Sequence, residues 1–415
     1  MTAIKVLHVV TKHYGGGAAL ATVRLHNALL SNCSNVNSSI LTSHSQSPFT
    51  NSSIKHNTHY KLLPTFKIYA SHIYTRLLFP IEDGNRSPSI FPSNISSYIN
   101  NLDIDVVHLH WLQGEFLSIE DIGKITKPIV WTLHDCWPLL SSFHYPKTSS
   151  LKTFPQARLH YLSNIDDSLI DFYIKKRKIK SFKNISPSFI FPSQGFYDFS
   201  SPQCLYPNSH SYVVDNLLSS DYFELDYNLD DSAPTTFKLL WITAGLPWDS
   251  RKGLDILIQS LHILASVTKF KYELVIAGSI KSFEINIPFK VSFLPFTPCQ
   301  SEVISHYRNS HILLNPSYCE TFGYSSAEAL VCGIPVVAFN HSGSSSIIEH
   351  KSTGYLASPF SPYSFADGIE WVTVNIQLLR SIIFSMSSKS LIPGQNYHQI
   401  IADHLDIYHE TLCRS

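Results

Sequence analysis

Residues 312–339 alternate between apolar strand-like runs and one helix-like run, and this alternation predicts a parallel α/β unit. Residues 312–314 and 335–339 are continuous apolar runs typical of buried strands, and residues 325–331 between them have helix-forming composition. Ligands on open parallel sheets bind beyond the carboxyl ends of the strands. We therefore expect a ligand site in the loop that follows residue 314.

Two carboxylates, Glu320 and Glu328, are the only charged side chains in this segment. A rise of ~1.5 Å per helical residue allows a separation of up to ~12 Å, whereas a hydrolytic acid/base pair requires ~5–9.5 Å. The spacing favours contact with two hydroxyl-rich parts of one long ligand. An ordinary βαβ unit with an acid at a helix N-terminus would explain Glu320 but not the rest of the segment.

The segment resembles the family-4 retaining glycosyltransferases of the GT-B fold, whose signature is Glu-x7-Glu with Phe-Gly after the first Glu and Gly-x-Pro-Val after the helix. The matching residues are Glu320, Phe322-Gly323, Glu328 and 333–336. The resemblance implies an α/β fold of two Rossmann-like, doubly wound domains that face a cleft. It also implies that Glu320 contacts the sugar of a nucleotide-sugar donor and that Glu328 holds its ribose.

The chain length predicts two domains, because 415 residues exceed what one hydrophobic core usually serves. We expect an acceptor-side domain at 1–228 and a nucleotide-sugar domain at 229–395, with a linker in the acidic, proline-containing stretch 227–236. An amphipathic helix at 396–415 would, by the resemblance, return to the first domain.

Composition excludes some classes of function. The 31 Lys and Arg residues balance 31 Asp and Glu residues, so nothing electrostatic favours nucleic acid. Seven cysteines without a Cys-x-x-Cys pair argue against disulfides or a zinc ribbon and fit a reducing cytosol. The N-terminus lacks a secretory pattern, and no apolar run approaches the ~18 residues of a membrane span. We expect a cytoplasmic protein.

A glycine loop near the N-terminus is the second candidate ligand site. An apolar strand-like run at 4–10 leads to Gly15, Gly16 and Gly17, and a helix-like run follows at 18–30. Glycines let the backbone approach a ligand, and the free N–H groups of a helix start attract an anion. A purely structural tight turn would look the same, but beside the Glu pair we expect Gly16 and Gly17 to bind the donor.

On its residues alone, His134 is better explained as a strand-end histidine bonded to Asp135 or to the backbone. The resemblance reverses this preference, because His134 matches the histidine that related enzymes place beside the donor sugar. His108 and His110 alternate along one strand and face the same side. Two such histidines can ligate a metal, but no third ligand is evident and the related enzymes need none. We therefore predict no metal site and no cofactor.

Lys252, directly before Gly253, matches the family lysine that neutralises the donor diphosphate. The matching arginine usually lies about five residues earlier, where this chain has Leu246 or Pro247, so either Arg251 substitutes for it or the contact is lost. A solvated basic turn would explain both cations equally well without the Glu motif.

Further patterns bear on the acceptor. The strings HLHWL and VWTLHDCWPL resemble the colanic-acid-type subgroup that builds bacterial exopolysaccharide or lipopolysaccharide repeats, but the cysteines that often follow the equivalent of His144-Tyr145 are missing. Basic residues interleaved with apolar ones at 61–79 and 175–180 suit an anionic membrane surface that presents a lipid-linked acceptor. A solvated helix face explains the second cluster equally well.

These observations predict a retaining, metal-independent hexosyltransferase of cell-surface polysaccharide synthesis, cytoplasmic or peripheral on the inner membrane face. It would use a UDP- or GDP-linked donor and a glycan or lipid-linked acceptor. Two alternatives remain, namely a GT-B sugar-nucleotide epimerase and a non-catalytic partner that only binds nucleotide-sugar.

Overall fold

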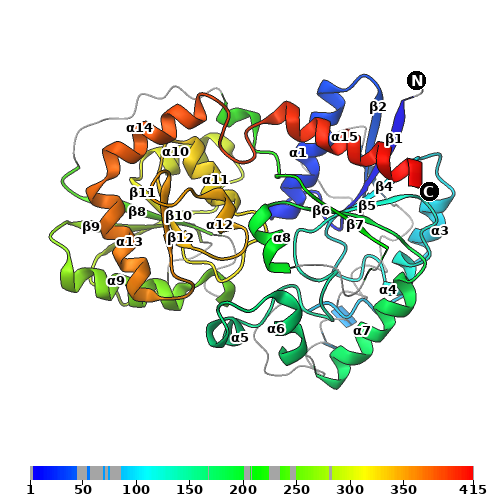
Figure 1. The fold of residues 1–415 in the computed structure, drawn as a ribbon, viewed down its shortest axis with the longest axis horizontal. Helices are drawn as coiled ribbons and strands as arrows, with labels where there is room; N and C mark the ends of the chain where they lie inside the picture. The colour runs from blue at the N-terminus through cyan, green and yellow to red at the C-terminus, as the bar shows by residue number, and fades with distance from the viewer. Residues whose placement is uncertain are drawn as a thin grey trace.

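The computed structural model describes residues 3–43, 54–56, 69–70, 73–74, 86–166, 168–200, 206, 208–223, 234–243, 249–279 and 283–414. Two parallel sheets, each flanked by helices, form two halves of the molecule (Figure 1). The first sheet has the strand order β3-β2-β1-β4-β5-β6-β7, and the second has the order β10-β9-β8-β11-β12-β13. The predicted α/β fold with two doubly wound sheets is confirmed.

The strands of the two sheets are short and parallel throughout. Those of the first sheet are β1 (Ile4–Val9), β2 (Val36–Thr42), β3 (Ile54–His56), β4 (Val106–Leu109), β5 (Ile129–Thr132), β6 (Ser188–Phe191) and β7 (His210–Val213). Those of the second are β8 (Phe237–Ile242), β9 (Tyr272–Ser279), β10 (Lys290–Pro295), β11 (Ile312–Asn315), β12 (Val336–Phe339) and β13 (Gly354–Ala357).

Helices connect the strands and cover both faces of each sheet. The helices before residue 230 are α1 (Gly17–Asn32), α3 (Ile95–Asn100), α4 (Ile119–Ile122), α5 (Thr148–Thr153), α6 (Leu159–Asp166), α7 (Leu169–Phe182), α8 (Gln194–Ser200) and the 3₁₀ turn η3 (Ser220–Tyr222). Those after it are η4 (Ser250–Lys252), α9 (Leu254–Val267), α10 (Gln300–Arg308), α11 (Tyr324–Val331), α12 (Ser344–Ile347), α13 (Pro362–Val374), α14 (Ile376–Ser387) and α15 (Tyr397–Arg414).

The central strands explain why the sequence reads as continuous apolar runs. Every residue of β4, β5, β6, β11 and β12 is buried, because helices cover both faces of a parallel sheet. The edge strands β7 and β10 are more exposed. The predicted helix between β11 and β12 is α11, so the βαβ unit that carries Glu320 and Glu328 is present.

The last helix, α15, packs on the first sheet. It contacts β4, β5 and α1, and Figure 1 shows it (red) beside the N-terminal elements (blue). Ile400, Ile401, Ile407 and Tyr408 are buried there in one apolar cluster with residues of β1 and β4. The C-terminal residues thus complete the core of the N-terminal half.

Helix α8 lies between the two halves in Figure 1, and its backbone closely approaches the second half. A Cβ on Gly195 would lie 2.1 Å from the carbonyl oxygen of Ser342, so only glycine fits. Gly195 N–H donates to Ser346 Oγ (3.1 Å), and Ser193 Oγ donates to the carbonyl of Thr321 (2.6 Å). These contacts fix the loop before α12, and with it the loop of Glu320, against the first half.

Among its described residues, the stretch 32–57 contains a short strand, β3, that pairs with β2. Its three residues sit in a stretch rich in Ser and Asn that masks the strand pattern. Most of the predicted linker and of the basic stretch 61–79, together with Leu246 and Pro247, lies outside the described residues. Among the described helices, none combines the length and apolarity that a bilayer crossing requires.

Candidate active site

The loop after β11 holds Glu320 through its backbone. Glu320 N–H donates to Ser342 Oγ (3.0 Å), and Gly343 N–H donates to the Glu320 carbonyl (2.8 Å). A Cβ on Gly343 would lie 2.9 Å from that carbonyl oxygen, so glycine is needed for this approach. The turn that follows β12 therefore positions Glu320 at the carboxyl edge of the sheet.

Two cations neutralise the Glu320 carboxylate. Lys252 Nζ lies 2.8 Å from Oε1 and Arg251 Nη1 lies 3.8 Å from Oε2. Burial by itself raises the pKa of Glu320, but the charges of Lys252 and Arg251 outweigh it and lower the pKa to about 2. Glu320 is consequently ionised at any physiological pH, with 14% of its side chain exposed.

Arg251 has three further protein contacts. Its guanidinium bonds Asp249 Oδ2 (2.9 Å) and the Cys319 carbonyl (3.1 Å), and it stacks 4.3 Å from the ring centroid of Tyr145, which belongs to the first half. Gly253 follows with φ of 71°, and a Cβ there would lie 2.0 Å from the Pro316 carbonyl oxygen. This close packing brings both cations to the Glu320 loop.

Glu328 on α11 meets an arginine from the other half. Arg24 of α1 donates from Nη2 to Glu328 Oε1 (3.3 Å), and the Tyr307 hydroxyl of α10 donates to Oε2 (3.1 Å). Burial raises the pKa of Glu328, and the charge of Arg24 only partly opposes this. The two signature glutamates therefore differ: Glu320 pairs within its own half, whereas Glu328 bridges the boundary.

His134 lies at the end of β5, on the first-half side of the boundary. Its carbonyl accepts hydrogen bonds from the Tyr145 hydroxyl (3.1 Å) and from Thr321 Oγ1 (3.4 Å), the neighbour of Glu320. Its ring is only partly buried, and Nε2 lies 3.0 Å from His110 Nδ1. The alternative bond between His134 and Asp135 does not form, because Asp135 accepts from His144 Nδ1 instead (2.7 Å).

The glycine loop faces the start of α11. Gly15 and Gly16 have φ of 70° and 84°, a region that glycine enters without steric cost. Helix α1 begins at Gly17, and no side chain caps its first N–H groups. A Cβ on Gly17 would lie 3.6 Å from the ring of Tyr324. An uncapped helix N-terminus thus lies beside the Gly323 turn, whose φ is 95°.

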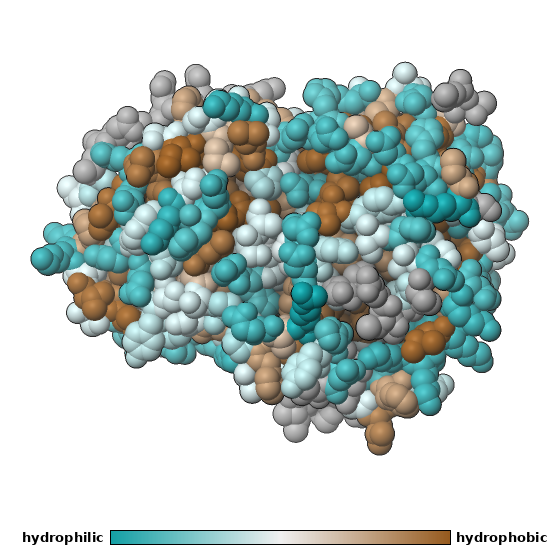
Figure 2. All heavy atoms as spheres, in the orientation of Figure 1, coloured by the Kyte–Doolittle hydropathy of each residue, from teal (hydrophilic) through white to brown (hydrophobic). Residues whose placement is uncertain are grey.

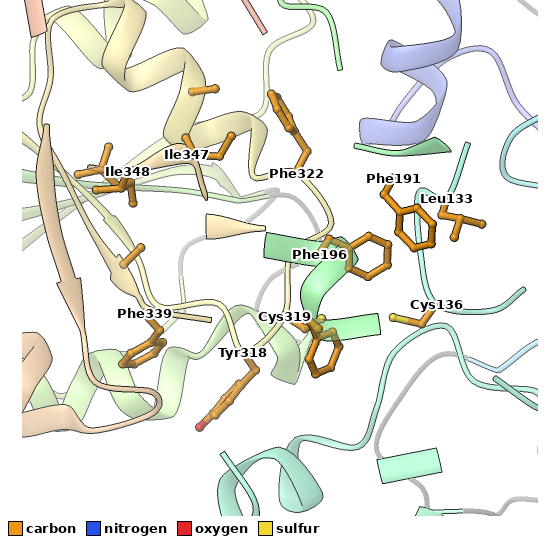
Figure 3. Close-up of a cluster of buried hydrophobic side chains, with 14 of the residues drawn as sticks. Leu133, Cys136, Phe191, Phe196, Tyr318, Cys319, Phe322, Phe339, Ile347 and Ile348 are labelled. Atoms are coloured by element: carbon orange, nitrogen blue, oxygen red, sulfur yellow. The ribbon is translucent and has the colours of Figure 1, made fainter. Parts of the chain in front are cut away.

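An apolar core joins the two halves behind these polar groups. Figure 3 shows Phe191, Phe196 and Cys136 of the first half facing Phe322 and Cys319 of the second, all within one cluster of buried side chains. Phe322 as a whole residue is 1% exposed, so its ring belongs to this core. The six described cysteines are free thiols.

Sequence reasoning missed Arg24 and Tyr307. Arg24 carried one usable signal, because it is the only Lys, Arg, Asp or Glu in the apolar run 18–30. Tyr307 carried none, since its role depends on the way α10 packs beside α11. Among the predicted residues, the structure places Arg251 and Lys252 beside the Glu320 carboxylate. It places Glu328, Gly17 and Gly323 at the boundary between the two halves.

Comparison with known proteins finds a family match within the second half. Residues 248–383 match the family described as "Glycosyl transferases group 1". The match includes Arg251, Lys252, Glu320 and Glu328. It begins after the first sheet, so it does not cover the half that carries His134 and the glycine loop.

Curated relatives align over part of the chain. An uncharacterized glycosyltransferase of Haemophilus influenzae is 30% identical over 158 residues, which cover 36% of this chain and 42% of that protein. The capsular polysaccharide biosynthesis glycosyltransferase CapM of Staphylococcus aureus is 26% identical over 169 residues, covering 39% of this chain and 44% of CapM. The chain thus spans under half the length of these relatives.

Solved structures align over almost the whole chain. TarM aligns with a TM-score of 0.64 at 13% identity, covering 98% of this chain and 99% of TarM. Anabaena Alr3699/HepE, solved in complex with UDP and glucose, aligns with a TM-score of 0.61 at 15% identity, covering 97% and 99%. WaaG, a glycosyltransferase of lipopolysaccharide biosynthesis, aligns with a TM-score of 0.55 at 15% identity, covering 97% and 99%. These alignments establish the two-domain GT-B fold.

Proposed function

We propose that this protein is a retaining glycosyltransferase that moves a hexose from a nucleotide-sugar to a glycan or lipid-linked acceptor. The observation that carries the proposal is the meeting, at one interdomain boundary, of an ionised Glu320 paired with Lys252, of Glu328, and of His134. If the signature served only to form the βαβ unit, its two glutamates would need no cations and no histidine beside them. Here the cations and the histidine come from elements outside that unit.

The cations and helix starts suit a diphosphate. Lys252 and the uncapped N–H groups of α1 offer positive charge, and the backbone of Phe322 and Gly323 adds donors at the start of α11. We propose Lys252 as the principal phosphate ligand. Arg251 is already bonded to Asp249 and Cys319, so in this proposal it adds positive charge near the diphosphate without binding it directly.

Glu320 and Glu328 then bind the two hydroxyl-rich parts of the donor. Glu320, held ionised, accepts hydrogen bonds from the sugar hydroxyls, and Glu328 accepts from the ribose in exchange for its contacts with Arg24 and Tyr307. We propose a front-face route without a covalent intermediate, because Lys252 already neutralises the Glu320 carboxylate. In this route the leaving phosphate accepts the acceptor's proton, and the surrounding N–H groups stabilise the charge that grows on it.

We further propose that the reaction needs no metal ion, since protein cations and N–H groups supply the positive charge. Turnover should therefore persist in excess EDTA. Loss of activity on chelation, restored by a divalent ion, would contradict this part of the proposal while leaving the transfer itself in place.

A UDP-linked donor and a cell-surface glycan product are the finer part of the proposal. UDP is supported by the complexes of Alr3699/HepE, and surface polysaccharide by the printed roles of CapM and WaaG. GDP remains an outcome of the test below.

Helix α7 provides a surface for a lipid-linked acceptor. Leu169, Phe172, Tyr173 and Ile179 are exposed on the same helix face as Lys176, and Figure 2 shows brown patches at the lower edge of the molecule, where α7 lies in Figure 1. The predicted basic cluster is only partly on this surface, because Lys178 is buried against the carbonyls of Trp137 and Leu140. We propose that the exposed face of α7 docks on anionic lipid. Binding to phosphatidylglycerol vesicles at low salt, lost in a Phe172→Ser, Tyr173→Ser double variant, would test it.

A panel of nucleotide-sugars tests the function directly. A true donor should raise the melting temperature in a concentration-dependent way, and addition of glycan or lipid-linked acceptors should then release the nucleoside diphosphate. An isomerised sugar in the absence of acceptor would instead support the epimerase. Binding with neither transfer nor hydrolysis would support the non-catalytic partner.

A further inference from the structure

Five buried histidines and the partly buried His134 gather behind the candidate site, on the side of the first sheet that α15 covers. Their rings stack or meet edge to face along a path from α15 and α1 to the end of β5. The members are His8 on β1, His26 on α1, His108 and His110 on or just after β4, His134 after β5 and His404 on α15. Burying so many titratable rings in a hydrophobic core is costly, which suggests that at least some of them serve the site.

Three of these histidines form one continuous hydrogen-bonded chain. His8 Nδ1 lies 3.0 Å from His110 Nε2, and His110 Nδ1 lies 3.0 Å from His134 Nε2. Both ring nitrogens of His110 are therefore used. At the inner end, His8 Nε2 is buried and has no hydrogen-bond partner in the part of the chain that the structure describes. At the outer end, His134 Nδ1 has no hydrogen-bond partner among the described residues, and the ring is partly exposed at the domain boundary.

All three rings are neutral at physiological pH. Burial lowers the pKa of His8 and of His110 well below 6.5, and it lowers the pKa of His134 to about 4. A neutral imidazole has one N–H donor and one acceptor nitrogen. The chain can therefore point in only two directions, and every ring must change tautomer together.

The two directions differ at the buried end. If each ring carries its proton on Nε2, His8 presents an N–H group to the core with nothing to accept it. If each ring carries its proton on Nδ1, His8 leaves only a lone pair unused. Orphaned buried N–H groups are the rarer defect in proteins, so the second direction is favoured.

We propose that His8 and His110 are positioning residues that fix His134 as the Nδ1–H tautomer, so that His134 presents a neutral hydrogen-bond donor to the ligand. The order of donation is His8 Nδ1–H to His110 Nε2, then His110 Nδ1–H to His134 Nε2. His134 Nδ1–H is left for an oxygen of the bound molecule. With no acceptor lone pair facing the ligand, His134 does not act as a general base.

A metal ion at His8, His108 and His110 is the competing interpretation, because nitrogens of these three residues lie within 4.8 Å of one another. The hydrogen bonds argue against it. His108 bonds the Tyr408 hydroxyl through Nδ1 and Thr132 Oγ1 through Nε2, both at 2.8 Å, and His110 is bonded at both nitrogens. Of these three rings, only His8 Nε2 offers a free lone pair, whereas a metal needs three ligands.

The tautomer can be read directly by NMR. Long-range ¹H–¹⁵N correlation on ¹⁵N-histidine-labelled protein, with His134 assigned from a His134→Gln spectrum, distinguishes a protonated from an unprotonated Nδ1. We expect His134 to be protonated on Nδ1 and bare on Nε2. Protonation on Nε2, or a stoichiometric transition metal in elemental analysis, would overturn the proposal. This measurement on the unmodified protein decides the direction even if a core variant fails to fold.

Variants at His8 test whether the chain transmits the effect. His8→Leu removes the N–H that donates to His110, so His134 should become a mixture of tautomers. His8→Asn places an amide N–H where Nδ1 was and should restore the Nδ1–H form. His108→Phe is an equally buried control outside the chain and should leave the His134 signals unchanged. No shift in His8→Leu, or an equal shift in His108→Phe, would contradict the proposal.

The activity readout rests on the proposed function. His8→Leu should lower kcat/KM by about tenfold, the effect of one lost hydrogen bond to the reacting complex, and His8→Asn should recover most of it. Failure of the proposed function would appear as no turnover in the unmodified protein, with the NMR result unaffected. Normal turnover in His8→Leu alongside a shifted tautomer would remove the positioning role.

Discussion

Lys252 and Glu320 show how a mostly buried carboxylate is kept ionised. Burial opposes the charge, but a lysine at 2.8 Å and an arginine at 3.8 Å outweigh it. Lys252 must exchange part of this contact for phosphate when a donor binds. Glu320 therefore holds the Lys252 ammonium group in position before a donor binds.

Lys252→Ala should raise the donor KM and lower kcat, because a charge-assisted bond to the phosphate is lost. Such bonds contribute about 1.5–3 kcal/mol, which corresponds to a loss of about ten- to a hundredfold in kcat/KM. Lys269→Ala, at an exposed position outside the site, is the matched control. Steady-state kinetics that do not differ between the two variants would refute the role of Lys252.

The Arg24–Glu328 contact should couple the two halves. Both side chains are nearly buried, with 11% and 12% exposed, so screening by solvent is limited. We expect a coupling free energy of about 1–3 kcal/mol in a double-mutant cycle of Arg24→Met and Glu328→Gln, measured by urea unfolding. Purely additive effects would show that the contact contributes nothing. A nucleotide-sugar that displaces Arg24 should reduce the coupling.

At this scale the sequence predicted the residues whose motif is local. Glu320 and Glu328 are indicated by their spacing to Phe-Gly and Gly-x-Pro-Val, and Lys252 by the glycine that follows it. Arg24 and Tyr307 could not be, because they reach Glu328 from separate helices and their sequence neighbours say nothing about that distance. His8 was likewise invisible as the partner of His110, since β1 and β4 are adjacent only in the folded sheet.

Among the elements, α8 has the most specific task. It is short, yet its Gly195 touches the loop that positions Glu320, and Ser193 bonds Thr321. The two halves can approach this closely at Gly195 because glycine has no Cβ atom.

Gly195→Ala should disturb the site without touching a candidate ligand-binding residue. The new Cβ would meet the Ser342 carbonyl at 2.1 Å, so the backbones must separate. We expect a loss of stability of about 1–3 kcal/mol, as for an overpacked core, together with a raised donor KM. Gln194→Ala on the exposed face of the same helix is the control. A variant with unchanged melting temperature and KM would show that the halves adjust freely.

Element prediction succeeded where burial imposes long apolar runs and failed where it does not. The strands β11 and β12 and the helix α9 were recognisable because their apolar residues follow the strand and helix periods. The three-residue strand β3 lies in a polar stretch, and its pairing with β2 is a tertiary effect. The local composition of residues 54–56 therefore does not predict their pairing with β2.

For the molecule as a whole, the buried histidines should dominate the response to acid. Burial lowers the pKa of all six members of the cluster, so below about pH 6.5 the unfolded chain takes up protons that the folded chain refuses. Each such histidine removes up to about 1.4 kcal/mol of stability per pH unit. Asp215, with its pKa raised to about 6, and Glu328 oppose this trend because they bind protons when folded.

The melting temperature should therefore fall steeply between pH 7 and pH 5.5. Glu320 and Asp171, both with pKa lowered to about 2, cannot cause that fall, because their stabilisation is lost only below their unfolded pKa values near 4. His26→Asn, which keeps a donor toward Ser38, should reduce the slope by about one proton. His409→Gln, at an exposed position, should leave it unchanged. A melting temperature that stays constant down to pH 5 would contradict the neutral state of the cluster.

Helix α15 also bears on how this chain is made. Its Tyr408 and isoleucines close the core over β4, roughly three hundred residues upstream, and over β1, roughly four hundred residues upstream. During synthesis β1 and β4 leave the ribosome long before residues 397–414 are made. The apolar surface that α15 covers is therefore exposed to solvent during that time. A truncation that removes α15 should therefore destabilise the N-terminal half far more than the loss of a peripheral helix would, because it uncovers this part of the core.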